Sequence, residues 1–379
     1  MASIVSLILV VLLAYAWGMY PGVLRALATA RRRHRAGEWP NGPEDTCPSV
    51  AILLSAYNEE EHIEGRLRNL LELDYPGDKI AVVVGSDGST DRTVEIARSV
   101  AAGHPSVRVY DFAENRGKAA VLRDLVSNVS SRAPDETPEA LVFTDANTVF
   151  AKDALKMLVR HFHDAEVGGV CGKLVLGAGG KRAAHIRRLP LATCRSSAER
   201  TYWDWEARLK EWESALDSCL GANGAVYAIR RGLFWAELPG NTIVDDFVVG
   251  MKVREQGHRM IYDARALAYE ELPETGAEWT RRVRIGAGDF QALALCRRCL
   301  LPRYGRFAWM FWSHKVLRWF TPHLLLLTAA VACAGLARAG GRQAWFHAAV
   351  LGRCRLSCCA RRSGCDCGSC GCSVCAGIS

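Results

Sequence analysis

Hydrophobic residues between positions 49 and 150 fall into short runs that end in small or polar residues. Four runs are almost wholly apolar, which is typical of buried strands: residues 50–55, 80–84, 107–110 and 140–143. Segments with apolar positions at helical spacing lie between and after them: residues 59–73, 91–101 and 117–127. Strands that alternate with helices in this way predict an α/β fold with a mostly parallel sheet flanked by helices.

Polar residues gather where three of these strands end, at residues 55–58, 86–91 and 144–147. Ligands of parallel sheets bind at the carboxyl ends of the strands. The sequence therefore predicts a binding site along this edge.

The first 18 residues are almost wholly apolar after Met1, and the run extends weakly to Leu24. This is long enough for a helix to cross a bilayer. No Lys or Arg precedes the run and four basic residues follow it, which places the next domain in the cytosol by the positive-inside rule. A signal peptide stays open as an alternative, because Ala26, Ala28 and Ala30 resemble a cleavage site.

A second apolar stretch covers residues 319–337 and follows a segment rich in Trp and basic residues. It predicts another span or a re-entrant helix. The formal net charge is +8, and the basic residues cluster beside the two apolar stretches. That placement favours a partner membrane with anionic lipid over nucleic acid.

Two groups of residues at strand ends, and one lysine at the start of a helix, carry candidate chemistry for binding a charged ligand. Asp145 and Asn147 offer oxygen ligands for Mg²⁺ or Mn²⁺, although Asp-Ala-Asn is also good turn chemistry. Asp87 suits a ribose hydroxyl or a base N–H. Lys118 stands at a helix start, where a diphosphate would meet both its charge and the helix terminus, unless it is simply a solvated lysine.

Two further clusters lie later in the chain. Asp245 and Asp246 stand in an apolar stretch, where neighbouring carboxylates raise one pKa and suit a general base; a helix cap is the alternative. Arg281, Arg282 and Arg284 carry charge suited to a leaving diphosphate, or form a juxtamembrane basic face.

The order and separations of these stretches resemble glycosyltransferase family 2, which has the GT-A fold, and its membrane-bound bacterial members in particular. The resemblance runs from about Ser49 to Leu293 and rests on these stretches: residues 55–60, 85–91, 115–118, 144–148, 221–224, 244–246 and 281–284.

The resemblance implies an inverting enzyme that moves a sugar from a nucleotide donor, a UDP-sugar by preference, to a lipid or saccharide hydroxyl. It implies Mg²⁺ or Mn²⁺ as cofactor and a multi-pass protein of the inner membrane with a cytosolic catalytic domain. The implied roles are nucleotide-sugar binding by Ala56, Tyr57, Glu59, Asp87, Lys118, Asp145 and Arg281; metal binding by Asp145 and Asn147; an acceptor side at Gly221, Asn223 and Gly224; and catalysis by Asp246, Asp245 and Arg284.

Two departures from the family pattern matter. Asn147 replaces the second acid of the metal motif, and an amide oxygen is a weaker cation ligand than a carboxylate. In the Gln-x-x-Arg-Trp motif of processive members, Arg281 stands for Gln and Ile285 for Trp, while Arg284 keeps its place. Synthesis of a long polymer is therefore less favoured than one or a few additions.

The predicted organisation has six segments: a transmembrane helix at 1–24, a basic cytosolic linker at 25–48, the catalytic domain at 49–295, a basic and aromatic membrane-proximal segment at 296–318, a second transmembrane helix at 319–338, and a Cys-rich tail at 339–379. The tail reads as a frameshifted or truncated end, with a metal-binding tail as an alternative. Two other functions stay open: a nucleotidyltransferase, and a membrane scaffold with a decayed site.

Overall fold

The computed structural model describes residues 2–34, 47–131, 137–177, 197–270 and 277–338. The chain divides into two compact units, Pro21–Val316 and a second unit of Met1–Tyr20 with Leu317–Ser379. The predicted Cys-rich tail lies outside the described residues.

The larger unit is built on one eight-stranded sheet with the order β3-β2-β1-β4-β7-β6-β8-β5. Its strands are β1 (Val50–Ala56), β2 (Ile80–Asp87), β3 (Val107–Phe112), β4 (Ala140–Thr144), β5 (Thr148–Phe150), β6 (Val167–Leu176), β7 (Tyr227–Arg230) and β8 (Arg259–Glu270). The four strands predicted from the sequence are β1 to β4, and they pair in parallel.

The rest of the sheet differs from the mostly parallel arrangement that the sequence predicts. β7 runs antiparallel to both β4 and β6, and β5 runs antiparallel to β8, whereas β6 and β8 are parallel. The sheet is therefore mixed: a parallel half built of β1 to β4 joins the other half through an antiparallel pair, and the strand direction reverses twice more within that half.

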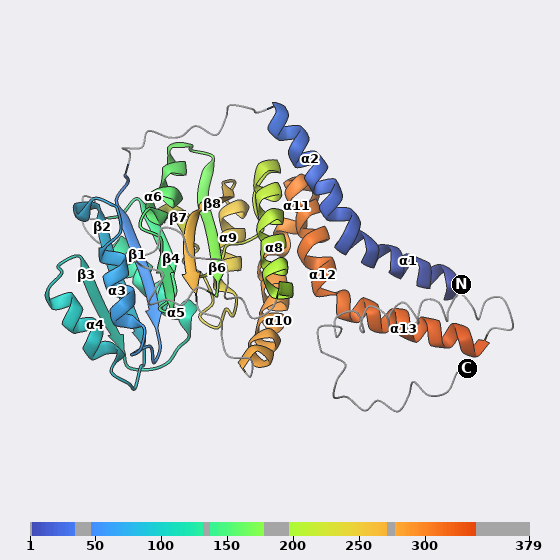
Figure 1. Cartoon of the computed structure of the whole chain (residues 1–379). Coiled ribbons are helices and arrows are strands. Elements are labelled where there is room, and N and C mark those ends of the chain that lie inside the picture. The colour runs from blue at the N-terminus through green and yellow to red at the C-terminus, as the bar shows by residue number, and fades with distance from the viewer. Residues whose placement is uncertain (1, 35–46, 132–136, 178–196, 271–276, 339–379) are drawn as a thin grey trace. The chain divides into compact units, whose positions relative to one another are not determined.

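Helices cover both faces of this sheet (Figure 1). The main helices of this unit are α2 (Tyr20–His34), α3 (Ile63–Leu71), α4 (Thr93–Ala102), α5 (Lys118–Ser130), α6 (Ala154–Val159), α8 (Ser197–Leu216), α9 (Asp245–Glu255) and α10 (Ala277–Leu295). Helix α2 starts one residue before the first residue of the unit. Alternate β1 side chains such as Ile52 and Leu54 share one apolar core with α3, α4 and α6. α5 covers the opposite face, where Gly85 leaves room for Val121.

Short helical turns complete the unit: η2 (Gly77–Lys79), η4 (Arg160–His163), η5 (Arg231–Leu233), η6 (Arg297–Leu300), η7 (Pro302–Tyr304), α11 (Arg306–Met310) and η8 (Phe311–Val316). Phe307 and Phe311 are fully buried, so the segment after α10 is part of the packed unit.

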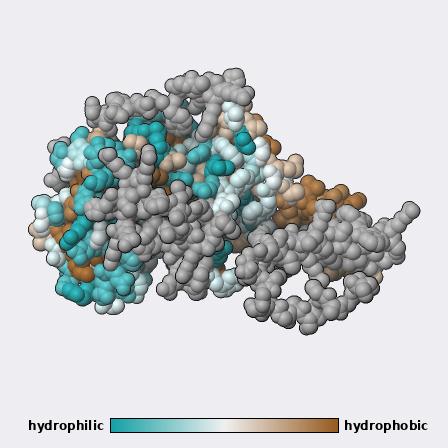
Figure 2. Space-filling model, viewed as in Figure 1, coloured by the Kyte–Doolittle hydropathy of each residue, from teal (hydrophilic) through white to brown (hydrophobic). Residues whose placement is uncertain are grey.

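The second unit contains α1 (Ala2–Ala14), η1 (Tyr15–Met19), α12 (Leu317–Trp319) and α13 (Thr321–Arg338), and α1 packs against α13. Trp17 Nε1 donates to Thr321 Oγ1 at 3.1 Å, and the Arg318 guanidinium lies 4.7 Å from the centre of the Trp17 ring. Ile4, Leu7, Ile8 and Val11 of α1 expose more than half of their side-chain surface, and this part of the molecule appears hydrophobic (Figure 2).

One described helix, Ile4–Arg31, is long and apolar enough to cross a membrane. The predicted second span corresponds to a helix pair, Arg306–Trp319 and Thr321–Gly335, that is bent by 61°. A bend of this size fits either a broken span or a re-entrant segment.

Candidate active site

Asp87 ends β2, and its carboxylate is held by the backbone that leads into α5. Oδ1 accepts from the Arg116 amide at 2.7 Å and Oδ2 from the Gly117 amide at 2.8 Å. Gly117 has a φ of +91°, a conformation that L side chains rarely adopt. The acid and this turn therefore fix each other and place Lys118 at the first position of α5.

Lys118 contacts the carboxylate that follows β4. Its Nζ donates to Asp145 Oδ1 at 2.5 Å, and both side chains are about one-third exposed, at 33% and 34%. Burial alone lowers the pKa of Lys118, but Asp145, Asp245 and Asp246 outweigh burial and raise it. The lysine stays charged and interacts electrostatically with three carboxylates, of which Asp145 contacts it directly.

The two acids at the start of α9 occupy different environments. Asp246 Oδ2 accepts from the Gly224 amide at 2.6 Å, and its Oδ1 accepts from the Phe247 amide at 2.8 Å. Asp245 is 5% exposed, and burial raises its pKa to about 6, with Lys118 opposing the shift and Asp246 adding to it. In the predicted pair, Asp246 is held by two backbone amides, whereas Asp245 is buried and its ionised form is disfavoured.

The glycine-rich segment 221–224 lies against this pair. Gly221 has a φ of +72°, and a Cβ there would collide with the Phe247 ring. A Cβ at Gly224 would stand 3.3 Å from Asp246 Oδ2 and 3.5 Å from Lys118 Nζ. Glycine is required here so that the backbone can approach the charged cluster closely.

Asn147 faces an acid on β8 that the sequence did not single out. Its Nδ2 donates to Glu270 Oε1 at 3.1 Å. Burial raises the pKa of Glu270, Asp145 adds to the shift, and Arg281 opposes it. Arg281 therefore acts electrostatically on this end of the site, whereas Arg284 forms no hydrogen bond or ion pair with the cluster among the described residues.

The segment after β1 borders the same edge. Ala56 pairs with Ser86 of β2 in register, and the Tyr57 side chain is 49% exposed. Asn58 Oδ1 accepts from the Thr90 amide at 2.9 Å, which ties the loops after β1 and β2 together. Burial raises the pKa of Glu59, and Asp145 is among the charges that add to the shift.

Three further groups support the cluster and carry no recognisable sequence signal. Lys210 of α8 donates from Nζ to the Ala222 carbonyl at 3.4 Å, and Asp246 is one of the acids that raise its pKa against the effect of burial. Arg66 is 2% exposed and donates to Thr144 Oγ1 at 2.5 Å, directly before Asp145. Glu270 is the third. Each lies outside the family stretches that the sequence analysis singled out, so no motif marks it.

The donor set fits a divalent cation that takes few protein ligands. Asp145 supplies a carboxylate, and Asn147 presents its amide oxygen once its nitrogen is committed to Glu270. No group of three or more His, Cys, Asp or Glu able to hold a metal occurs within the described part of the chain. Most of the coordination shell would therefore come from ligand oxygens and water, as is usual for Mg²⁺ and Mn²⁺.

Comparison with known proteins shows which family and which fold this chain resembles. Residues 51–232 match the model of glycosyl transferase family 2. Poly-beta-1,6-N-acetyl-D-glucosamine synthase of Staphylococcus aureus is 25% identical over 270 residues, which are 70% of this chain and 60% of the relative. The same enzyme of Staphylococcus epidermidis is 25% identical over 252 residues, 64% of this chain and 55% of the relative. The chain thus spans less than two-thirds of the length of these relatives.

A mannosyltransferase from Pyrobaculum calidifontis, solved in complex with GDP-Man and Mn²⁺, superposes with a TM-score of 0.67 at 24% sequence identity. The match covers 96% of this chain and 93% of that one, and it shows the fold. Residues 51–232 thus resemble glycosyltransferase family 2, and the chain has the GT-A fold.

Proposed function

We propose that the chain moves a sugar from a nucleoside-diphosphate donor, a UDP-sugar by preference, to a hydroxyl of a lipid or saccharide acceptor. One observation carries the proposal: Asp145, Asp245 and Asp246 converge on Lys118 at the carboxyl ends of the parallel strands, beside the turn that Asp87 holds. Such an edge is where α/β sheets bind nucleotides. The mannosyltransferase named above was solved with GDP-Man, a nucleotide sugar, and the synthase is named for a polymer of N-acetylglucosamine, which supports a nucleotide-sugar donor here.

The donor would lie along this edge with its nucleoside near β1 and β2. Tyr57 offers an exposed ring and Ala56 its backbone, while Asp87 faces the ribose or base. The diphosphate would reach the start of α5, where Lys118 and the helix N-terminus both favour negative charge. The acceptor would approach from the side of Gly221, Asn223 and Gly224.

The reaction we propose is a direct displacement with inversion. The acceptor oxygen attacks the anomeric carbon, and Asp246 takes the proton from that oxygen as the new bond forms. The bond between the anomeric carbon and the diphosphate oxygen breaks, and its electron pair leaves with the nucleoside diphosphate. The Gly224 amide orients Asp246, while Lys118, Arg281 and Arg284 offset the charge on the departing group.

Asp145 and Asn147 would hold Mg²⁺ or Mn²⁺. When bound, the ion neutralises charge on the diphosphate. The neutral amide at Asn147 makes the protein a weak metal ligand by itself, so binding of the ion and of the donor would be linked.

The acceptor side is proposed to face the cytosolic surface of the cell membrane. Support comes from Ile4–Arg31 and from the bent pair Arg306–Trp319 and Thr321–Gly335, which would give a multi-pass arrangement if both insert. A lipid acceptor or a growing saccharide near the surface would then be accessible to the same edge of the sheet.

Membranes from cells that make the protein test the proposal directly. They are incubated with UDP-N-acetylglucosamine, UDP-glucose and GDP-mannose, each labelled either in the sugar or in the α-phosphate, with and without Mn²⁺. Transfer of the sugar label alone into lipid or polymer supports the proposal. Transfer of the α-phosphate label indicates a nucleotidyltransferase, and no transfer or donor hydrolysis by any of the donors indicates a scaffold with a decayed site.

A further inference from the structure

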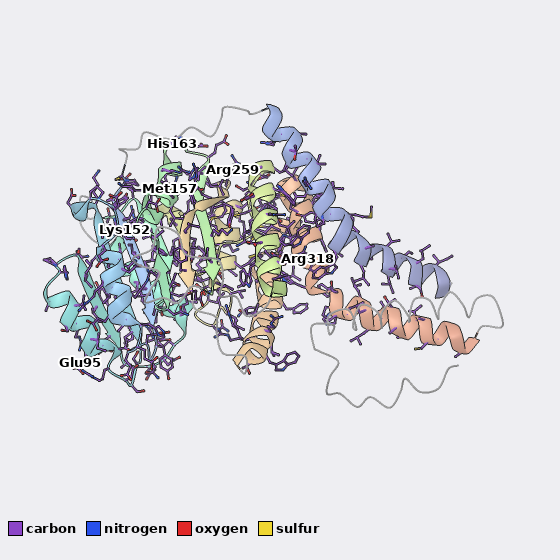
Figure 3. The ribbon with its side chains drawn as sticks, in the orientation of Figure 1. Glu95, Lys152, Met157, His163, Arg259 and Arg318 are labelled. Carbon is purple, nitrogen blue, oxygen red and sulfur yellow. The ribbon has the colours of Figure 1, made fainter. Side chains whose placement is uncertain are left out.

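A cavity at the opposite end of α9 and β8 from the acidic cluster is lined by arginines. Its volume is about 560 Å³, and the arginines are Arg31, Arg254, Arg259, Arg303 and Arg306. Arg259 begins β8 (Figure 3), whereas Glu270 at the other end of that strand contacts Asn147 of the proposed active site. α9 likewise begins at Asp245 and ends at Glu255, next to Arg254. The cavity is therefore a separate feature.

Among the residues that line this cavity, arginines outnumber acidic residues. Its lining includes five guanidinium groups and two carboxylates, Glu166 and Asp217. Asp217 is already committed, because Arg254 donates to its two oxygens from Nε at 2.9 Å and from Nη2 at 3.3 Å. The lining residues alone therefore carry a formal charge of +3 around a space large enough for a headgroup-sized ligand.

Two of the arginines that line the cavity are exposed to solvent. Arg303 and Arg306 have exposed side chains, and neither forms an ion pair within the described part of the chain. The Arg303 guanidinium instead lies 4.9 Å from the centre of the Tyr304 ring and donates to its hydroxyl at 3.2 Å. Tyr304 in turn donates from its hydroxyl to the Glu255 carbonyl at 3.4 Å, which fixes this segment to the end of α9.

Arginine forks bind phosphate oxygens with two parallel hydrogen bonds, which is why several of them around one cavity indicate a phosphate ligand. Arg31 is the last residue of the candidate span Ile4–Arg31, and Arg306 is the first residue of the bent pair. Basic residues at these positions lie where a helix would leave a bilayer, and basic pockets at that level bind phospholipid headgroups.

We propose that this arginine cavity binds the phosphate of an anionic ligand, supplied by a phospholipid headgroup or by free phosphate. The site is independent of sugar transfer. A bound headgroup would join α2, the end of α9 and the η7–α11 segment through one ligand, and would stabilise the folded unit by binding it and not the unfolded chain.

Thermal unfolding of the full chain in detergent at constant ionic strength tests this. The probes are inorganic phosphate, short-chain phosphatidylglycerol and short-chain phosphatidylcholine. The test variant is R303Q/R306Q, whose side chains are exposed and outside the proposed active site. The matched control is R68Q/R98Q, which removes the same charge from two exposed arginines on α3 and α4.

We expect an anionic probe to raise the Tm of the parent and of the control. In R303Q/R306Q the half-saturating concentration should rise about tenfold or more, since two charge-assisted contacts are lost. A response to phosphate identifies free phosphate as sufficient, and a response to phosphatidylglycerol alone identifies the headgroup. Equal responses to phosphatidylcholine, no response to either anion, or equal loss in both variants would overturn the proposal.

Discussion

Two places on the same sheet edge hold carboxylates in opposite ways. Asp87 accepts two backbone hydrogen bonds, from Arg116 and Gly117, and is 3% exposed. Asp245 is almost as buried, yet its Oδ2 has no hydrogen-bond partner among the described residues, and burial raises its pKa to about 6.

The two environments suit different roles for the two carboxylates. The two backbone amides hold the Asp87 carboxylate in one position, which suits recognition of a ligand. Burial instead disfavours the ionised form of Asp245, so the protonation of this group responds to the charge of a ligand that enters. Under the proposed function, the nucleotide would bind at the end of β2 and the reaction would take place at the start of α9.

The comparison is tested most severely by Asp246→Asn. Asparagine keeps the contact with the Gly224 amide through its carbonyl oxygen, loses the contact with the Phe247 amide, and cannot accept the acceptor proton. We expect sugar transfer to fall about 100- to 10,000-fold, the usual contribution of a positioned base, while UDP binding stays within a few fold of the parent. Radiolabel transfer and calorimetric UDP binding measure the two quantities, and transfer at the parent rate would exclude Asp246 as the base.

Asp87→Asn tests the end of β2, where the nucleotide would bind. The amide cannot satisfy both backbone donors, so the turn at Gly117 loosens and the nucleotide loses its acceptor. We expect UDP to bind about 10- to 100-fold more weakly, in keeping with a charge-assisted contact. At saturating donor, transfer should fall much less than in Asp246→Asn. Ser86→Ala, which changes the neighbouring hydroxyl, is the control, and should bind UDP nearly as the parent does.

The parallel half of the fold was predictable because local patterns decide it. Residues 50–55, 80–84, 107–110 and 140–143 are short apolar runs, and they form β1 to β4 with boundaries within a few residues. The other half of the sheet could not be predicted in the same way. Strand β7 is only four residues long, and its direction depends on pairing with β4 and β6, which lie far away in the chain. No local period records that pairing.

The candidate site was predictable to the same extent. Asp87, Asp145 and Asp246 follow motifs with fixed spacing, and the structure brings Asp145 and Asp246 to Lys118 and Asp87 to the turn before it. Lys210, Arg66 and Glu270 act through contacts across the fold. Each is a single charged residue on a helix or strand, where a solvated side chain is the usual outcome, so only the three-dimensional arrangement reveals them.

Asn147→Asp sharpens the account of the metal motif. A second carboxylate would strengthen cation binding, but without the ion it would face Glu270, which now accepts from the Asn147 amide. We expect the half-saturating Mn²⁺ concentration for transfer to fall about tenfold, because a neutral oxygen ligand is replaced by a charged one. Titration of Mn²⁺ at fixed donor measures this, with Asn223→Asp as a control for an added charge nearby. An unchanged Mn²⁺ requirement would contradict the assignment of Asn147.

Asp289→Asn has the smallest expected effect and concerns stability alone. Burial raises the pKa of Asp289 to about 6, with Lys315 opposing the shift and Asp246 adding to it. Because this value lies above that of an unfolded aspartate, the folded protein binds the proton more tightly, and the parent loses stability as the pH rises from about 4 to about 6. Asparagine does not titrate, so the variant should be more stable than the parent above pH 6 by on the order of 1–2 kcal/mol, and the difference should vanish near pH 4.

Chemical denaturation at pH 4.5, 6 and 7.5 would follow this difference, with Asp74→Asn as the control, since Asp74 is exposed and pairs only with Lys156 at 2.8 Å among the described residues. A constant difference across the three values would mean that Asp289 acts through packing and not through its charge. A difference that grows with pH would identify Asp289, like Asp245, as a carboxylate whose ionised form is disfavoured by burial.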